Sequence, residues 1–250
     1  MQATGVMTGK FTGGVMISLS YVIWVYLITF SGEIISSSVS KLPVFSAINK
    51  TVEADICYVI ITTLIAALFS LLTDMFACGL CLFFLKIATG QIPFSGDLFY
   101  GFKNDPKKVF TVSFLLYAPV LVLSIPFNVF VELYTRTSEK NCLYLAVLFV
   151  VLAIICAVWM HLNFGLSYYM MLDFPGFSAL KTMDVTRKKM HGHKKRLLSL
   201  ELRFIPLALL GILSFGIGFL WIYPLVEESR SLFFLNLMNP DHYVKIDERV

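Results

Sequence analysis

Residues 140–173 read KNCLYLAVLFVVLAIICAVWMHLNFGLSYYMMLD, and this stretch decides the fold. Between its terminal charges, Lys140 and Asp173, lie 32 residues without a formal charge. About 20 apolar residues in an α-helix suffice to cross the roughly 30 Å hydrocarbon core of a bilayer. A run this long and this apolar therefore predicts a membrane-spanning helix.

The rest of the chain has the same character. Of its 250 residues, 58% are hydrophobic and 14% are charged, and the mean hydropathy is +0.79. Soluble domains are roughly 45–50% apolar and about 25% charged, so a water-soluble globule and a disordered chain are both excluded. A net charge of +4 is also too small to suggest nucleic-acid binding. We expect an all-α polytopic transmembrane helix bundle, built as a single integral-membrane domain over residues 1–250.

Four further windows between charged residues are long enough to span. They hold 22, 30, 23 and 23 residues, and the second is interrupted only by Asp74. These windows are residues 11–32, 56–85, 109–131 and 204–226. The first four helices that the charge spacing predicts are residues 12–34, 56–85, 109–131 and 142–170.

The window 204–226 permits two interpretations. Gly216 and Gly218 lie at its middle, and glycine is a weak helix former, so the chain is expected to turn there. Two helices, 197–214 and 219–239, then bring the count to about six. This arrangement carries Glu227, Glu228 and Arg230 to membrane depth, where each charge costs a few kcal/mol unless it is paired. Glu227 and Arg230 are three residues apart and can pair along a helix. A count of five helices is the alternative.

Orientation follows the lysines and arginines of the short loops. The loops 87–108 and 173–201 hold 10 of the 14 basic residues found in the loops between the predicted helices. Both loops are therefore expected in the cytoplasm, together with the N-terminus. The C-terminal tail is then cytoplasmic with six helices and external with five.

The cytoplasmic basic segment, residues 174–196, is expected to contain an interfacial helix before the fifth membrane helix. Ser178 is a good N-cap, and Phe177, Leu180, Met183 and Met190 are expected on one face, opposite the cations. The basic residues of this segment are Lys181, Arg187, Lys188, Lys189, Lys194, Lys195 and Arg196. Such a helix suits anionic lipid at the cytoplasmic face, or a membrane protein partner. His191 and His193 lack nearby carboxylates or thiolates, so we expect no metal site.

Polar residues inside the predicted spans are candidate functional positions. They are Asp74, Ser70, Asn128, His161 and Asn163. Ser70 and Asp74 share a helix face with small residues, which typically pack against neighbouring helices in a membrane. An ionisable residue within an apolar run is also a functional candidate by default. His161 either pairs with Asp74 or lies at the membrane interface, and the sequence leaves both open.

Several segments resemble a known family. They are residues 178–181, 190–197, 200–205 and 213–224, with Gly79, residues 84–86 and residues 98–103 in the earlier half. Together they are similar to an uncharacterised bacterial integral-membrane family, the domain of unknown function 975, over about residues 75–238. The chain departs from the family's pattern at Arg203 and Pro206 and in its charges near residue 228. The resemblance implies a multi-helix fold in a bacterial plasma membrane, six helices, a cytoplasmic C-terminus and no established activity.

No catalytic constellation stands out, and the sequence predicts no enzyme, no cofactor and no catalytic residue. The pattern favours a non-enzymatic membrane partner or scaffold, accessory to envelope or peptide-export processes. A small transporter or permease-like carrier that uses intramembrane polar residues is the alternative. A membrane enzyme acting on lipid ranks last, because no HExxH, GxSxG or paired acidic metal motif is present.

Overall fold

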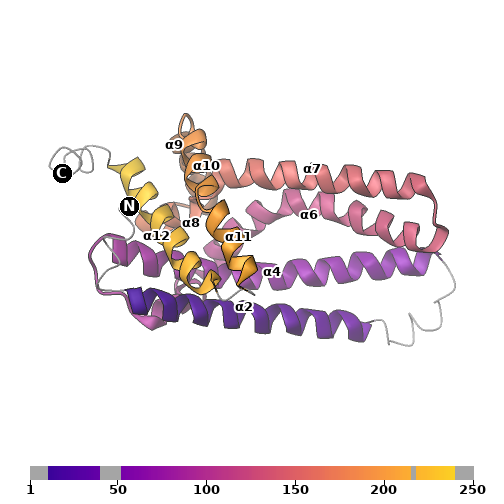
Figure 1. Ribbon diagram of the computed structural model, residues 1–250, viewed down its shortest axis with the longest axis horizontal. Helices are drawn as coiled ribbons and strands as arrows, with labels where there is room; N and C mark the ends of the chain where they lie inside the picture. The colour runs from indigo at the N-terminus through magenta and orange to yellow at the C-terminus, as the bar shows by residue number, and fades with distance from the viewer. Residues whose placement is uncertain (1–10, 40–51, 215–217, 240–250) are drawn as a thin grey trace. The chain divides into compact units, whose positions relative to one another are not determined.

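The computed structural model describes residues 11–39, 52–214 and 218–239, and throughout these ranges the regular structure is helical (Figure 1). The helices follow one another along the chain as α2 (Phe11–Val39), α4 (Val52–Ala88), the 3-10 helix η1 (Ser95–Phe99), α5 (Tyr100–Lys103), α6 (Pro106–Thr137), α7 (Lys140–Phe164), α8 (Ser167–Asp173), α9 (Ala179–Met190), α10 (Lys194–Leu202), α11 (Ile205–Leu213) and α12 (Phe219–Met238). The all-α prediction is confirmed.

Four stretches of helix within the described residues are long and apolar enough to cross a membrane. They are Thr12–Val39, Asp55–Ala88, Pro106–Thr137 and Lys140–Asp173. Each of the first four predicted helices lies within one of these stretches. The last of them has a break at Gly165 and Leu166, where α7 ends and the short α8 begins.

The predicted helix 197–214 is wrong as a single element. The structure divides it at Arg203 and Phe204 into α10 and α11. Pro206 lies in the first turn of α11. Proline has no backbone N–H, and its ring clashes with the carbonyl of the residue four positions earlier, here Leu202. Pro206 therefore favours a break at this point, and neither piece is among the four membrane-length helices.

The predicted turn after this region is confirmed, because α11 ends at Leu213 and α12 begins at Phe219. The Ser214 hydroxyl donates to the Gly211 carbonyl at 2.8 Å and accepts from the Gly218 N–H at 2.8 Å. A Cβ on Gly218 would lie 2.9 Å from the Gly211 Cα, so the two helices approach at a contact only glycine permits. The predicted helix 219–239 agrees with α12.

The helices group into two compact units. One unit comprises residues 24–74 and 113–161. There Asn128 of α6 donates to the Thr63 hydroxyl of α4 at 3.1 Å, and Arg136 pairs with Asp55. Ring stacking of Phe130 on Phe149, with centroids 5.7 Å apart, joins α6 to α7.

The other unit comprises residues 1–23, 75–112 and 162–250, and it contains two very close backbone approaches. A Cβ on Gly79 would lie 2.1 Å from the Leu98 carbonyl oxygen, and one on Gly101 would lie 2.4 Å from the Met75 carbonyl oxygen. These glycines let the end of α4 pack directly on η1 and α5. Lys86 and Asp97 pair at 2.7 Å across the same contact.

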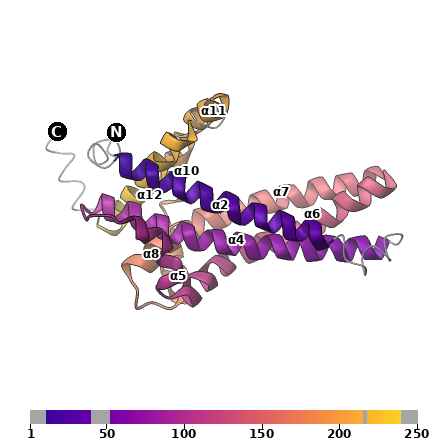
Figure 2. The ribbon, with the colours of Figure 1, turned by 90° about the horizontal axis from the view of Figure 1, so that it is seen from below.

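The buried core of this unit gathers α4, α8, α9, α10 and α12. It consists of Cys81, Leu85, Leu166, Tyr169, Met170, Met190, Leu197, Phe233 and Phe234. Figure 2 shows α10 beside α12, the two helices that contribute Leu197 and the phenylalanine pair. The second half of α12 is therefore covered by protein.

Candidate functional site

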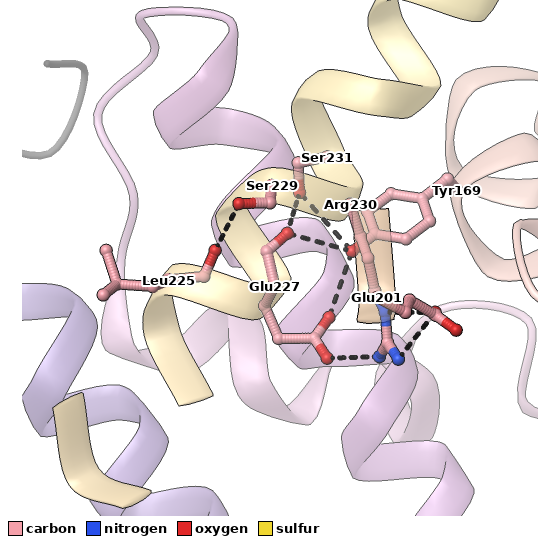
Figure 3. A network of polar contacts seen from close by, with 7 residues as sticks. All are labelled: Tyr169, Glu201, Leu225, Glu227, Ser229, Arg230 and Ser231. Carbon is pink, nitrogen blue, oxygen red and sulfur yellow. Dashed lines mark hydrogen bonds and ion pairs between the residues drawn. The ribbon is translucent and has the colours of Figure 1, made fainter. Parts of the chain in front are cut away.

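The charged residues of α12 form an ion network inside the protein (Figure 3). The Arg230 Nη1 donates to Glu227 Oε1 at 2.9 Å, as their spacing predicts. Its Nε and Nη2 both donate to Glu201 Oε1 of α10, at 3.2 and 3.0 Å. One guanidinium, which stays protonated at any physiological pH, thus bridges two carboxylates from two helices.

Tyr169 of α8 closes the network from a third helix. Its hydroxyl donates to Glu227 Oε2 at 3.1 Å, and it accepts from the Ser231 hydroxyl at 3.4 Å. Tyr169 is only 1% exposed, and Ser231 is fully buried. Burying a polar group costs free energy unless it is hydrogen-bonded, and this network satisfies both carboxylate oxygens of Glu227.

The network has two carboxylates, Glu201 and Glu227, and one cation, Arg230. Glu201 and Glu227 share Arg230, and the next residue to Glu227, Glu228, is fully buried. Breaking a buried charge pair leaves its partner uncompensated, so the network holds α8, α10 and α12 in one arrangement. No group of three or more His, Cys, Asp or Glu side chains suited to a metal ion occurs among the described residues.

The basic segment, residues 174–196, lies between Tyr169 and Glu201 in the sequence. Most of its cations are exposed. Lys194 is half-buried, and the exposed cations are Lys181, Arg187, Lys188, Lys189, Lys195 and Arg196. Ser178 caps α9 as predicted, since its hydroxyl accepts from the Lys181 N–H. The outer face of α9 and α10 is therefore a basic surface.

The face of α9 that packs against the protein differs in part from the predicted apolar face. The structure buries Thr182, Thr186 and Met190, which follow one another at four-residue intervals, whereas Leu180 is 68% exposed. The buried threonine hydroxyls donate to carbonyls one turn back, Thr182 to Ser178 and Thr186 to Thr182. Threonines that satisfy themselves in this way can face a protein core, and the apolar count alone misses them.

Two of the predicted positions meet in one contact. Lys194, the first residue of α10, donates to the Asn163 Oδ1 near the end of α7 at 2.6 Å. Asn163 is 1% exposed, so its side chain is buried and hydrogen-bonded. An intramembrane candidate and a residue of the basic segment, which were predicted separately, are therefore hydrogen-bonded to each other.

Two of the remaining intramembrane candidates, Ser70 and Asn128, make separate contacts. The Ser70 hydroxyl donates to the Ala66 carbonyl of its own helix at 3.0 Å, and Asn128 holds Thr63. Asp74 and His161 are both half-buried. A functional role for Asp74 stays a prediction.

Sequence reasoning found the Glu227–Arg230 pair and missed Glu201, Tyr169 and Ser231. Glu201 is a single acid that follows a run of cations, a pattern typical of a solvated charge. Its partner Arg230 is distant in the sequence, so the pairing has no local signal. Tyr169 looks like an interfacial tyrosine. The one usable signal was the cost of three charges in an apolar helix, which requires partners somewhere in the fold.

Four helices that are long and apolar enough to cross a membrane suggest a membrane protein, and one of its helical units carries a buried ion network and a basic surface. The family model described as a protein of unknown function (DUF975) matches residues 25–240, and the chain belongs to that family. The comparison with curated proteins found no match, and the comparison with solved structures found none either.

Proposed function

We propose that this chain is a multi-pass protein of a bacterial plasma membrane that acts without catalysis, as a scaffold whose basic surface holds anionic lipid or a membrane protein partner. Its N-terminus and the loops 87–108 and 173–201 lie in the cytoplasm in this proposal, because these loops concentrate the basic residues. An accessory role in envelope or peptide-export processes fits such a scaffold.

The observation that carries the proposal is the fixed presentation of the cations. Six of the seven cations of the basic segment are exposed, while the opposite side of α9 is buried and Lys194 anchors α10 to Asn163. Flexible basic tails lose conformational entropy on binding, whereas cations on a packed helix lose less. Each basic residue near an anionic membrane surface contributes about 1 kcal/mol.

Lipid binding by charge-reversed protein tests the proposal. Native mass spectrometry of the purified chain in mild detergent measures the affinity for phosphatidylglycerol and for phosphatidylcholine. The double variant Arg187→Glu/Lys189→Glu should lose at least about 2 kcal/mol for phosphatidylglycerol, which is about 30-fold in affinity, and should bind phosphatidylcholine as before.

Two controls separate charge from fold. The charge-preserving pair Arg187→Lys/Lys189→Arg should keep its affinity, and so should Lys140→Glu, which changes a cation on the opposite predicted side of the membrane. Unchanged phosphatidylglycerol binding in the reversed variant would remove lipid as the ligand. Proteins that co-purify with the wild type and with Lys140→Glu, but not with the reversed variant, would then identify a protein partner.

A small transporter is a second candidate, because the buried network holds carboxylates inside the protein. Ionisable groups in membrane interiors often mark ion or proton pathways, and the Glu227 carboxylate accepts hydrogen bonds from both Arg230 and Tyr169. Substrate-dependent proton flux into proteoliposomes, abolished by Glu227→Gln, supports this candidate. Flux that persists in Glu227→Gln excludes the network as its route.

A further inference from the structure

The hairpin of α11 and α12 turns within the last uncharged window of the chain, 204–226. Unbent, these 23 residues would form a helix long enough to span. The structure instead folds the window back on itself at Ser214 and Gly218. Each arm is then only about half of a membrane crossing.

The lengths of the two arms follow from the helix rise. Helix α11 has nine residues, or about 13.5 Å at about 1.5 Å per residue. The uncharged part of α12, residues 219–226, has a length of about 12 Å. The hydrocarbon core is about 30 Å thick. Neither α11 nor the uncharged part of α12 reaches from one side to the other.

The base of the hairpin is charged and its tip is not. Glu201 and Arg203 precede α11, and the charged group of α12 begins at Glu227. The Arg230–Glu201 ion pair joins the two ends of the window. Beyond this base, residues 204–226 contain no formal charge. The charged base therefore favours water, and the uncharged end of the hairpin favours an apolar environment.

The surface of the tip is apolar and open. Ile212 is 64% exposed and Leu213 is 75% exposed, and Leu209 and Leu210 are also exposed. Soluble proteins rarely expose such a contiguous patch. The other side of α11 packs on α12, where the Ile222 and Phe219 side chains lie against Gly211.

The hairpin also touches a membrane-length helix. The Tyr223 ring of α12 stacks on Tyr21 of α2, with centroids 5.7 Å apart and planes 16° apart. Tyr21 lies in the middle of the uncharged window 11–32, the part of α2 that a bilayer would surround. The arm therefore lies at the level of hydrocarbon rather than of bulk water.

We infer that the α11–α12 hairpin is a re-entrant element: it enters the membrane from the side of its charged base, and the far ends of its arms, Leu213 and Phe219, lie inside the hydrocarbon core. Lipid acyl chains cover the outer face of α11, and the chain crosses the membrane four times. This inference rests on the proposed multi-pass placement. It differs from a six-helix bundle, in which the tip emerges on the far side.

Labelling of single cysteines separates the two arrangements. In a cysteine-free background, Leu213→Cys marks the tip, Gly192→Cys marks the basic segment, and Glu139→Cys marks the turn between α6 and α7. A membrane-impermeant maleimide should label Glu139→Cys in intact cells and Gly192→Cys only after permeabilisation. It should label Leu213→Cys in neither case. Labelling of Leu213→Cys in intact cells, at the rate of Glu139→Cys, would overturn the inference.

A second measurement identifies what covers the tip. Leu213→Cys and Ile212→Cys are modified with a bimane fluorophore in detergent and reconstituted with lipids brominated along the acyl chain. Quenching at least twofold stronger than that of bimane at position 192 is expected. Quenching no stronger than at position 192 would mean that a protein surface or a second copy covers α11, and would overturn the lipid assignment. If Glu139→Cys and Gly192→Cys label from the same side, the multi-pass proposal fails instead, independently of the tip.

Discussion

Arg230 links two helices, because carboxylates from α10 and α12 share its guanidinium. Its guanidinium donates three hydrogen bonds, one to Glu227 and two to Glu201. The side chains of Arg230, Glu201 and Glu227 are 28%, 21% and 6% exposed, so solvent screens them weakly. The geometry is monodentate at each carboxylate, and the planar fork of arginine spans both in a way that lysine cannot.

Replacing Arg230 by methionine should destabilise the protein strongly. The change leaves Glu201 and Glu227 without their cation, at an expected cost of about 3–5 kcal/mol. Thermal unfolding in detergent should show a large fall in the midpoint for Arg230→Met. The double variant Arg230→Met/Glu227→Gln should regain part of the loss, because it removes a buried charge as well.

An exposed ion pair provides the matched control. Lys188 and Asp184 pair at 2.7 Å one turn apart on α9, with side chains 74% and 57% exposed. Exposed pairs contribute at most about 1 kcal/mol, so Lys188→Met should leave the unfolding midpoint nearly unchanged. Equal effects of Lys188→Met and Arg230→Met would contradict the network's structural role.

Gly79 and Gly101 are positions where a single methyl group should matter. A Cβ at either one would overlap a backbone carbonyl, of Leu98 or of Met75. Backbone does not yield as a flexible side chain does, so Gly79→Ala and Gly101→Ala should each cost about 1–3 kcal/mol or more. Gly176→Ala, with no atom within 4 Å of the new methyl group, is the control in the same unfolding measurement. Alanine tolerated equally at all three positions would show that α4 does not pack directly on η1 and α5.

At the scale of elements, the packed face of α9 is not marked by its apolar residues alone. The sequence predicts Leu180 and Met190 on one apolar face, but the packed face is set by Thr182, Thr186 and Met190. In a 12-residue helix with few apolar residues, two threonines that bond their own backbone decide the orientation. The apolar pattern was too sparse to exclude that arrangement.

The two residues should therefore respond differently to truncation. Met190 is fully buried in the core that α4, α8, α10 and α12 share, so Met190→Ala should cost about 2–5 kcal/mol. Leu180→Ala should change stability by less than about 0.5 kcal/mol in detergent, since its side chain is exposed. Comparable losses of stability in Leu180→Ala and Met190→Ala would indicate that both side chains pack on one face, as the sequence predicts.

The end of the chain shows what sequence could and could not supply among the elements. Charge spacing located the four membrane-length helices, because lipid penalises every unpaired charge within them. Glycines located the turn before Phe219. Pro206 is a further signal in the sequence, because a proline in the first turn of α11 favours the end of the preceding helix α10.

At the scale of the whole molecule, the candidate site resisted prediction for a physical reason. Glu201 and Tyr169 are 29 and 61 residues from Arg230 in sequence, and pairing at such separations leaves no local pattern. Only the i, i+3 partner Glu227 is encoded locally. Local rules thus predicted the helices and half of the ion network, and the tertiary contacts supplied the other half.

The proposed arrangement of four crossings and a re-entrant hairpin makes a definite prediction for the C-terminus. An even number of crossings returns the tail to the side of the N-terminus, whereas a single straight helix over 204–226 would place it opposite. A green fluorescent protein fused after Val250 should therefore fluoresce, and alkaline phosphatase at the same point should be inactive, because that enzyme needs an oxidising exterior to form its disulfides. The Ser214–Gly218 turn prevents the window 204–226 from forming one spanning helix. A variant with leucine at positions 214, 216 and 218 should therefore shift part of the population toward a straight helix. Its phosphatase fusion should be more active than the wild-type fusion. Strong phosphatase activity in the wild-type fusion itself would establish five crossings.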